Sequence, residues 1–320
     1  MDNFFKDKKV IITGGFGFIG SHLYKRLIQQ NANIVIIDRG GSNKFRLKDY
    51  LNEIKLYEVD ITDAEKLQKI IIEEKPEYVF HLAAYGVNAK DNNYIQAINT
   101  NIMGSINVLN ALKYSGCEKI INMGTSSEYG NQKSKENKAL KPTNIYGSTK
   151  ASSTIMLHQI ARNSEIDIVT LRPFNIFGEG EEPHKLFCEV IIKILQNEKV
   201  ELTDCTQYRD YTYISNIIDG LLLAAENKSV KNQIFNIASG ETHPLKYYVE
   251  KIFDISGTAN KPFYGFIPQR TDERMRQTVD IKKIRKILNW KPKISLEQGI
   301  ENTINWYKEN LCEYVRGIYV

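Results

Sequence analysis

The chain has 320 residues, of which 42% are hydrophobic and 25% are charged, which is close to an average globular composition. Its formal net charge of +5 is spread along the sequence. These values exclude a disordered chain and a disulfide scaffold, and they favour neither nucleic acid nor an anionic membrane as the main partner.

Short β-branched strands alternate with amphipathic helices in the first half of the chain. The strands are predicted at Val10–Thr13, Asn33–Asp38, Ile54–Val59, Tyr78–Ala83, Lys119–Met123 and Ile166–Leu171. The helices are predicted at Gly17–Gln30, Asp63–Glu74, Tyr94–Tyr114 and Asn144–Asn163. Because continuous apolar strands between helices are buried on both faces, the sequence predicts an α/β fold with a Rossmann-type, doubly wound parallel sheet.

The pattern changes after Arg172, where helices become shorter, strands weaker and prolines more frequent. We therefore predict a first domain over residues 1–172 and a smaller, interleaved α/β domain over 173–320, with an approximate boundary. Ligands of open α/β sheets bind beyond the carboxyl ends of the strands. The second domain is accordingly expected to bring substrate-binding groups to that edge.

Glycines at 14, 17 and 20 follow the first strand and open the first helix. In this context they permit a tight turn, close approach of the backbone to a pyrophosphate, and close helix packing. Asp38 ends the second strand, where an acid accepts hydrogen bonds from ribose hydroxyls and repels a 2′-phosphate. The pattern favours NAD, while the adjacent Arg39 leaves NADP possible. Asp60 and Ile61, after the third strand, are where an adenine amino group would need an acceptor.

A Tyr-x-x-x-Lys pair occurs three times, at Tyr129/Lys133, Tyr146/Lys150 and Tyr247/Lys251. Only Tyr146/Lys150 opens a long predicted helix, in which the spacing of four residues puts both side chains on one face. A nearby ammonium and a positive nicotinamide ring would lower the pKa of the phenol, so that it could act as an acid or base. Thr125, at the end of the fifth strand, is the candidate second hydroxyl.

With these motifs the chain resembles the extended short-chain dehydrogenases/reductases of the nucleotide-sugar epimerase/dehydratase family. The resemblance covers nearly the whole chain and includes Leu171–Gly178, Tyr208–Tyr211 and Arg270–Asp272. It implies an NAD(P)-binding first domain, a second domain that binds a nucleoside-diphosphate sugar, and a homodimer built on helices 94–114 and 144–163.

The resemblance also implies roles for individual residues. The catalytic residues would be Thr125, Tyr146 and Lys150. The cofactor would contact Gly14, Gly17, Phe18, Ile19, Gly20, Asp38, Asp60, Ile61, Leu82, Ala83, Ala84, Asn101, Tyr146 and Lys150. The substrate would contact Thr125, Ser126, Asn175, Arg209 and Arg270. No metal site is expected, because the remaining histidines lack acidic partners at metal spacing.

The residues after Thr125 narrow the choice among the reactions known in this family. Dehydratases of the family carry an acid pair directly after the Thr, and the decarboxylases an acid at the second of these positions, but here they are Ser126 and Ser127. Glu128 is one residue too far along unless the loop is rearranged. We therefore expect a C4 epimerase, with a 4-keto reductase of a deoxysugar as the alternative. A non-catalytic dinucleotide sensor is disfavoured because both the Tyr and the Lys are present.

One GDP-keto-sugar branch adds a Cys and a His to these residues. The Cys position is Ser127 here, and His184 is interpreted as an exposed loop residue. The four cysteines are scattered, and the first ten residues are charged without an apolar segment behind them. These features indicate a cytoplasmic protein.

Overall fold

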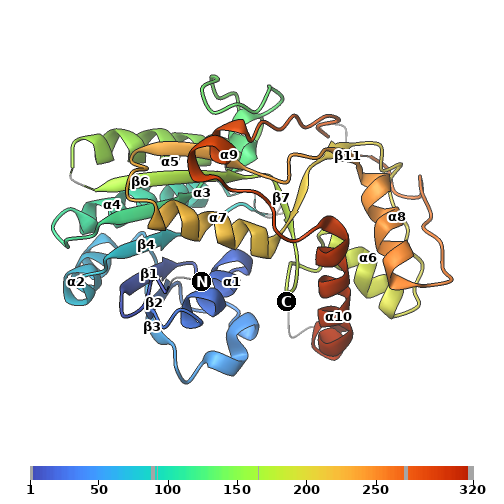
Figure 1. Ribbon diagram of the computed structural model, residues 1–320, viewed down its shortest axis with the longest axis horizontal. Coiled ribbons are helices and arrows are strands. Elements are labelled where there is room, and N and C mark those ends of the chain that lie inside the picture. Colours follow the sequence, from blue (N-terminus) through green and yellow to red (C-terminus); the bar gives the residue numbers. More distant parts are fainter. Residues whose placement is uncertain (1–2, 88–90, 92, 165, 270–272, 316–320) are drawn as a thin grey trace.

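A seven-stranded parallel sheet forms the centre of the molecule, in a computed structural model that describes residues 3–87, 91, 93–164, 166–269 and 273–315 (Figure 1). The strand order is β10-β6-β5-β4-β1-β2-β3. The strands are β1 (Lys9–Thr13), β2 (Asn33–Asp38), β3 (Lys55–Glu58), β4 (Tyr78–His81), β5 (Lys119–Met123), β6 (Asp167–Pro173) and β10 (Gln233–Ile237). The prediction of a Rossmann-type sheet is confirmed.

Helices cover both faces of this sheet. On one face lie α1 (Phe18–Ile28) and α7 (Ile214–Glu226), and on the other lie α2 (Ala64–Glu74), α4 (Ser105–Leu112) and α5 (Ile145–Arg162). Within β1, Val10 and Ile12 belong to the first apolar cluster, whereas Ile11 belongs to the second. Because both faces of the sheet are buried, apolar and polar residues do not alternate along the strand. The continuous apolar runs of the sequence therefore correctly indicated a parallel sheet covered on both sides.

Two features differ from the sequence-based expectation. The helix predicted at 94–114 is divided into α3 (Tyr94–Ile98), a π-helical turn η2 (Asn99–Gly104) and α4. The seventh strand, β10, was not among the predicted strands and comes from the second half of the chain. It pairs in parallel with β6, from Gln233 opposite Val169 to Ile237 opposite Pro173.

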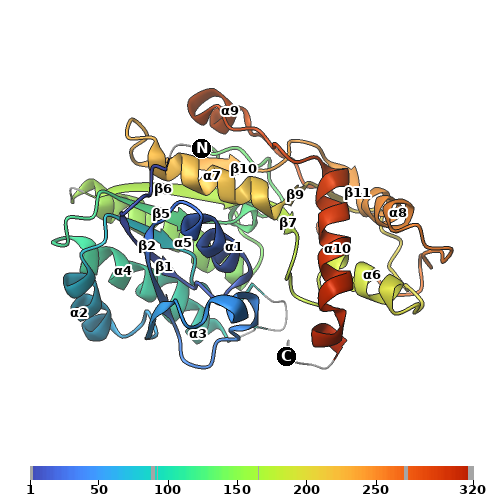
Figure 2. The same ribbon diagram turned by 60° about the horizontal axis from the view of Figure 1, so that its bottom comes forward.

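The rest of the second half lies beside the sheet, where α6 (Leu186–Leu195), α8 (Leu245–Ser256) and α10 (Leu296–Val315) pack together (Figures 1 and 2). Two small sheets join this group to the centre. They pair β7 (Asn175–Phe177) with β9 (Tyr211–Tyr213), and β8 (Tyr208–Arg209) with β11 (His243–Pro244). A short helix, α9 (Lys282–Leu288), packs on β10. The domain boundary near residue 172 stays a prediction. Two elements that follow it in the sequence belong spatially to the first domain, since β10 is the edge strand of the central sheet and α7 packs on one of its faces.

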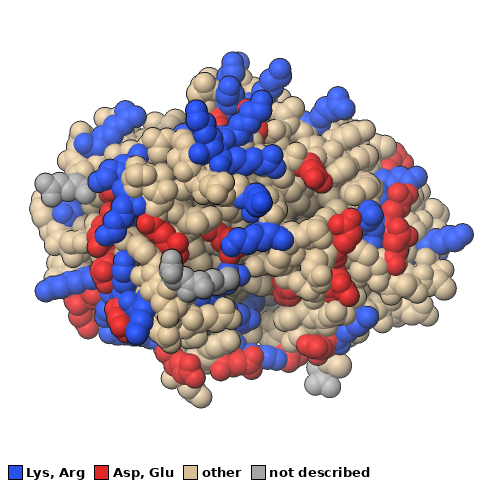
Figure 3. All heavy atoms as spheres, viewed as in Figure 1, with Lys and Arg blue, Asp and Glu red and all other residues tan. Residues whose placement is uncertain are grey.

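The positive charge is distributed less evenly in space than along the sequence. Figure 3 shows Lys and Arg side chains gathered at one edge of the visible face, over α9 and the loop after β5. A bridge between Ser134 and Val279 holds this loop against the segment that precedes α9. Among the described residues, no helix has the length and hydropathy needed to cross a membrane.

Candidate active site

The turn between β1 and α1 accepts only glycine at two of its three predicted positions. Gly14 has a φ of +71°, and a Cβ there would lie 2.8 Å from the Ala83 nitrogen. A Cβ on Gly20 would lie 2.3 Å from the Gly14 oxygen. Gly17 is the N-cap of α1 and supplies no side-chain cap, so the first amides of the helix remain available to a ligand. This close-packed turn at a helix N-terminus fits a dinucleotide pyrophosphate.

Asp38 connects the end of β2 to the glycine turn. One carboxylate oxygen accepts a hydrogen bond from the Phe16 amide at 3.0 Å, and the other accepts one from the Ser42 hydroxyl at 2.7 Å. The carboxylate therefore lies at the turn that would hold the pyrophosphate. Its expected contact with ribose hydroxyls stays a prediction.

The other predicted cofactor residues line the same edge of the sheet. Phe18 and Ile19 are half-buried in the first turn of α1, and Leu82, Ala83 and Ala84 are half-buried directly after β4. Asp60 is exposed and accepts a hydrogen bond from the Thr62 amide at 2.9 Å. Ile61 is buried beside Gly104, where a Cβ would lie 2.7 Å from the Ile61 side chain. The geometry gathers them at the carboxyl edge, as expected for a nucleotide site.

Asn101 lies in the π-helical turn η2 and is completely buried. Its amide nitrogen donates to the Tyr85 carbonyl and to the Thr149 hydroxyl, both at 2.9 Å, and its oxygen accepts from the Tyr85 amide at 2.8 Å. Asn101 thus joins the loop after β4 to α5. Contact with a cofactor stays a prediction for this residue.

The three predicted catalytic residues come together. Thr125 follows β5 and is the N-cap of the short helix η3 (Ser126–Tyr129). Tyr146 and Lys150 lie one turn apart on α5, a helix that Asn144 caps by accepting from the Gly147 amide at 2.7 Å. The Thr125 side chain lies near enough to the Tyr146 phenol to lower its pKa as a hydrogen-bonding partner.

Burial dominates the electrostatics of this group. It raises the pKa of Tyr146 to about 12, as does the negative charge of Glu128, while the Thr125 hydrogen bond acts in the opposite direction. Burial lowers the pKa of Lys150 to about 8, and Glu128 opposes that shift. The lowered phenol pKa predicted from the sequence is therefore not produced by the protein's own groups. That prediction named two positive groups, an ammonium and the nicotinamide ring of the cofactor. The ring is the one that is left to lower the pKa of the Tyr146 phenol.

Glu128, the displaced acid of the sequence analysis, is completely buried next to this group. Its Oε1 accepts from the Thr125 amide at 2.9 Å and from the Thr154 hydroxyl at 3.2 Å. Its Oε2 forms an ion pair with the Arg172 guanidinium at 2.8 Å. Burial raises the pKa of Glu128, while the Arg172 charge and the Thr125 amide oppose that shift. Because both carboxylate oxygens already have partners, the geometry does not favour Glu128 as a substitute for the missing acid pair.

Three of the expected substrate residues belong to the second half of the chain, namely Asn175, Arg209 and Arg270. The Asn175 amide donates to the Asp210 carbonyl and to the Gln277 side-chain oxygen, both at 2.9 Å. Gln277 in turn donates to the Ser126 hydroxyl at 3.4 Å. Ser126 and Asn175 are therefore linked through Gln277, while Arg270 lies outside the described residues.

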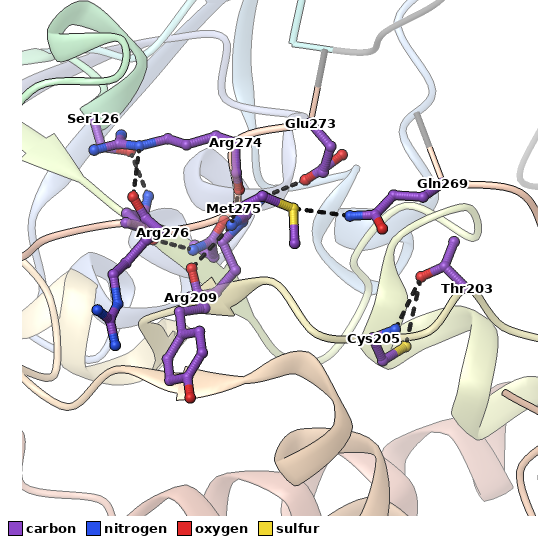
Figure 4. Close-up of polar contacts among 12 residues, drawn as sticks. Ser126, Thr203, Cys205, Arg209, Gln269, Glu273, Arg274, Met275 and Arg276 are labelled. Carbon is purple, nitrogen blue, oxygen red and sulfur yellow. Dashed lines mark hydrogen bonds and ion pairs between the residues drawn. The ribbon is translucent and has the colours of Figure 1, made fainter. Parts of the chain in front are cut away.

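Arg209 is oriented by neighbouring polar groups (Figure 4). It donates to the Arg274 carbonyl at 2.6 Å and forms an ion pair with Glu273. The sequence analysis missed Glu273, Arg274 and Gln277, although the charged run after Arg270 was a usable signal. A diphosphate that binds Arg209 has to compete with Glu273 for the guanidinium.

Three other residues considered in the sequence analysis, a tyrosine and two histidines, lie in surroundings that indicate no catalytic role. Tyr129, of the first alternative Tyr/Lys pair, is buried and bonds to Arg172 at 2.9 Å and to Asn236 at 2.7 Å. His184 is exposed in its loop, as expected. His81 is completely buried, and its ring nitrogens bond to two side-chain hydroxyls, those of Thr13 at 2.7 Å and Ser105 at 2.8 Å.

The parallel sheet and its glycine turn define a dinucleotide-binding α/β protein. A sequence model described as the NAD dependent epimerase/dehydratase family matches residues 10–238. The chain belongs to this NAD-dependent family.

Similar proteins carry several activities. The UDP-glucuronate 4-epimerase of Thermodesulfobacterium geofontis is 30% identical, over 97% of this chain and 99% of its own length. A dTDP-D-glucose 4,6-dehydratase of Dictyostelium discoideum is 29% identical, over 95% of this chain and 82% of its own length. The structure of the UDP-glucose 4-epimerase of Thermotoga maritima with UDP-glucose has a TM-score of 0.87 and 29% identity, covering 95% of this chain and 99% of that one. The comparisons establish the family and leave the reaction to the residues of the site.

Proposed function

We propose that this protein is an NAD-dependent epimerase that acts at C4 of a nucleoside-diphosphate hexose through a 4-keto intermediate. The observation that carries the proposal is the makeup of the Thr125 loop. Thr125 lies against Tyr146, serines occupy the next two positions, and the nearest carboxylate, Glu128, is locked against Arg172. The described residues of this site include groups that can move a proton at C4, and among them no free acid for dehydration is found.

The residues would divide the work as follows. Thr125 hydrogen-bonds to the C4 oxygen and holds it beside the phenol of Tyr146. The ionised phenol takes the proton of the C4 hydroxyl, and it returns that proton when the ketone is reduced again. Lys150, protonated near neutral pH, stabilises the phenolate. NAD bound to the glycine turn supplies the chemistry of taking up and returning the C4 hydrogen with its electron pair.

Inversion requires that the keto sugar present its other face before the hydrogen returns. The sugar must therefore turn while the nucleoside diphosphate stays bound. We propose that Arg209 and Asn175 hold the diphosphate side, since a guanidinium fork matches phosphate oxygens. Gln277 hydrogen-bonds to both Asn175 and Ser126. Binding of the diphosphate at Asn175 would therefore change the position of the Thr125 loop through Gln277.

We also propose a homodimer through α3 and α5. Their outward faces carry exposed apolar side chains that water solvates poorly, namely Tyr94, Ile95, Ile98, Ile155 and Met156. An isologous interface is the commonest way to cover such a face. Sedimentation of the protein and of Ile155→Glu tests this proposal, because a dimer should become a monomer. A cytoplasmic location stays a prediction.

The function is tested by one incubation. The purified protein is offered a panel of nucleoside-diphosphate hexoses without added coenzyme, and the configuration at C4 is followed by NMR. Inversion with no net change in bound NAD supports the epimerase. Absence of inversion, together with consumption of NAD(P)H on a 4-keto deoxysugar, would identify the reductase instead.

A further inference from the structure

A buried carboxylate lies directly behind the catalytic group and has no part in the proton transfer. Glu128 is completely buried, although a buried charge is costly unless it is paired. Its four polar contacts come from three different elements. Thr125 belongs to the loop after β5, Thr154 to α5, and Arg172 to β6.

The surrounding backbone is shaped to admit this side chain. A Cβ on Gly124 would lie 2.6 Å from the Glu128 Oε1 and 3.0 Å from the Arg172 side chain. A Cβ on Gly147 would lie 2.5 Å from the Ser127 oxygen, so α5 packs directly on the turn that carries Glu128. Two glycines thus leave room for the carboxylate and for the close approach of α5.

Thr154 lies on the catalytic face of α5. Residues 146, 150 and 154 are each four apart, so the side chains of Tyr146, Lys150 and Thr154 follow one another along one side of the helix. A single carboxylate therefore binds the backbone of Thr125 and the helix face that carries Tyr146. The relative position of the two hydroxyl groups of the site depends on Glu128.

The charge of Glu128 acts on the same helix. It opposes the burial that lowers the pKa of Lys150, and it adds to the burial that raises the pKa of Tyr146. Among the described residues, the titratable and charged groups that interact with Glu128 or Lys150 come from four elements: Arg172 from β6, His81 from β4, Tyr129 from η3 and Tyr146 from α5. His81 is neutral, because burial and then the charge of Lys150 lower its pKa to about 3. Burial raises the pKa of Glu128, but the ion pair with Arg172 at 2.8 Å opposes that shift. Among the described groups that act on the pKa of Lys150, Glu128 is the negatively charged one.

We propose that Glu128 is a positioning residue for the reaction at Tyr146: it holds the Thr125 loop against the Tyr146/Lys150 face of α5 and supplies the counter-charge of Lys150. The proposal rests on the function proposed above. Its two parts, the hydrogen bonds and the charge, are separated by different substitutions.

The charge is tested without any sugar substrate. Lysines labelled with ¹³C at Cε are titrated by NMR, and the Lys150 resonance is assigned from its loss in Lys150→Met. In the wild-type protein the midpoint is expected near 8. Glu128→Gln should move it to lower pH, whereas Thr154→Val, which keeps the charge and removes one hydrogen bond, should leave it in place. An unchanged or higher midpoint in Glu128→Gln overturns the charge role.

Glu128→Gln leaves the Arg172 guanidinium buried beside a neutral amide, which can prevent folding. The double variant Glu128→Gln/Arg172→Met removes both charges and should still show a downward shift of the Lys150 midpoint, smaller than that of Glu128→Gln because loss of the Arg172 charge acts in the opposite direction. If the double variant folds and titrates like the wild type, the counter-charge is not Glu128.

The hydrogen bonds are tested by Glu128→Asp, which keeps the ion pair with Arg172 but shortens the reach to Thr125. With UDP-glucose as the probe, kcat should fall on the order of 10- to 100-fold, because a displacement of about 1 Å is enough for such a loss. KM should stay within about twofold and the Lys150 midpoint should remain near that of the wild type. An unchanged kcat, or a rise in KM that accounts for the whole loss, rejects the positioning role. If the wild-type protein inverts no sugar nucleotide, the proposed function fails, while the NMR titration still decides the role of the Glu128 charge.

Discussion

Replacing Gly14 by Ala tests the glycine turn most directly, because the structure separates two costs there. The first is the left-handed backbone, with a φ of +71°, which costs an L residue about 1–2 kcal/mol. The second is contact, since the new Cβ would lie 2.8 Å from the Ala83 nitrogen and 2.9 Å from its Cα. Backbone atoms cannot move aside cheaply, so this overpacking adds about 1–3 kcal/mol. The expected total is about 2–5 kcal/mol.

A matched control isolates the first cost. Gly116 has a φ of +78° but nothing within 4 Å of its ideal Cβ, so Gly116→Ala carries only the backbone cost. The free energy of unfolding of both variants is measured by urea denaturation, and NAD binding by calorimetry. Gly116→Ala should lose about 1–2 kcal/mol of stability and bind NAD like the wild-type protein.

Gly14→Ala should lose more stability than Gly116→Ala or bind NAD more weakly. A turn that moves to relieve the contact displaces the amides that face the pyrophosphate, and 1.4 kcal/mol of lost binding energy is a tenfold loss of affinity. If Gly14→Ala matches Gly116→Ala in stability and the wild type in NAD affinity, the steric reasoning is wrong. In that case the turn tolerates a side chain and Gly14 is not required for the cofactor.

Three further predictions concern chemistry, substrate binding and pH. Tyr146→Phe should lower kcat by about 10²- to 10⁴-fold without changing the amount of bound NAD, and retention of a tenth of the turnover would contradict the role of the phenol. Glu273→Gln removes the carboxylate paired with Arg209 and should tighten binding of UDP by about two- to fivefold; weaker binding in calorimetry would show that Glu273 helps to hold the nucleotide. Burial lowers the pKa of His81 to about 3 and of His158 to about 4, so only the unfolded chain takes up their protons below pH 6.5. Stability should therefore fall by about 2 kcal/mol per histidine between pH 7 and pH 5. His158→Gln should lose about 2 kcal/mol less over that range in urea denaturation, and an equal loss in both proteins would refute this account.

Much of the fold could be read from local pattern. Strand β2 (Asn33–Asp38) and strand β5 (Lys119–Met123) have the bounds expected from their apolar runs. The helix from 94 to 114 was expected to be continuous, but a π-helical turn interrupts it at Asn99–Gly104. The side chain of Asn101 in that turn bonds to Tyr85 and Thr149, and such contacts between distant segments leave no mark on helical periodicity.

The proposed catalytic pair, Tyr146 and Lys150, shows how a local rule can suffice. An α-helix has about 3.6 residues per turn, so Tyr146 and Lys150, four positions apart, lie on one face of it whatever else the chain does. The choice among three Tyr/Lys pairs depended on which of them opened a long helix, and Tyr129 is indeed buried and bound to Arg172 and Asn236. Spacing along one helix is a property of the backbone, and so it is visible in the sequence.

By itself, therefore, the sequence determined the alternation of strands and helices, the glycine turn and the Tyr146/Lys150 face. The tertiary structure decided the contacts between distant segments: β10 as the seventh strand, Glu128 against Arg172, and Arg209 against Glu273. The physical reason is the distance along the chain over which each effect acts. Backbone geometry controls residues a few positions apart, whereas the partners of Glu128 and Arg209 depend on the order of the strands and on how the second half of the chain packs against the sheet.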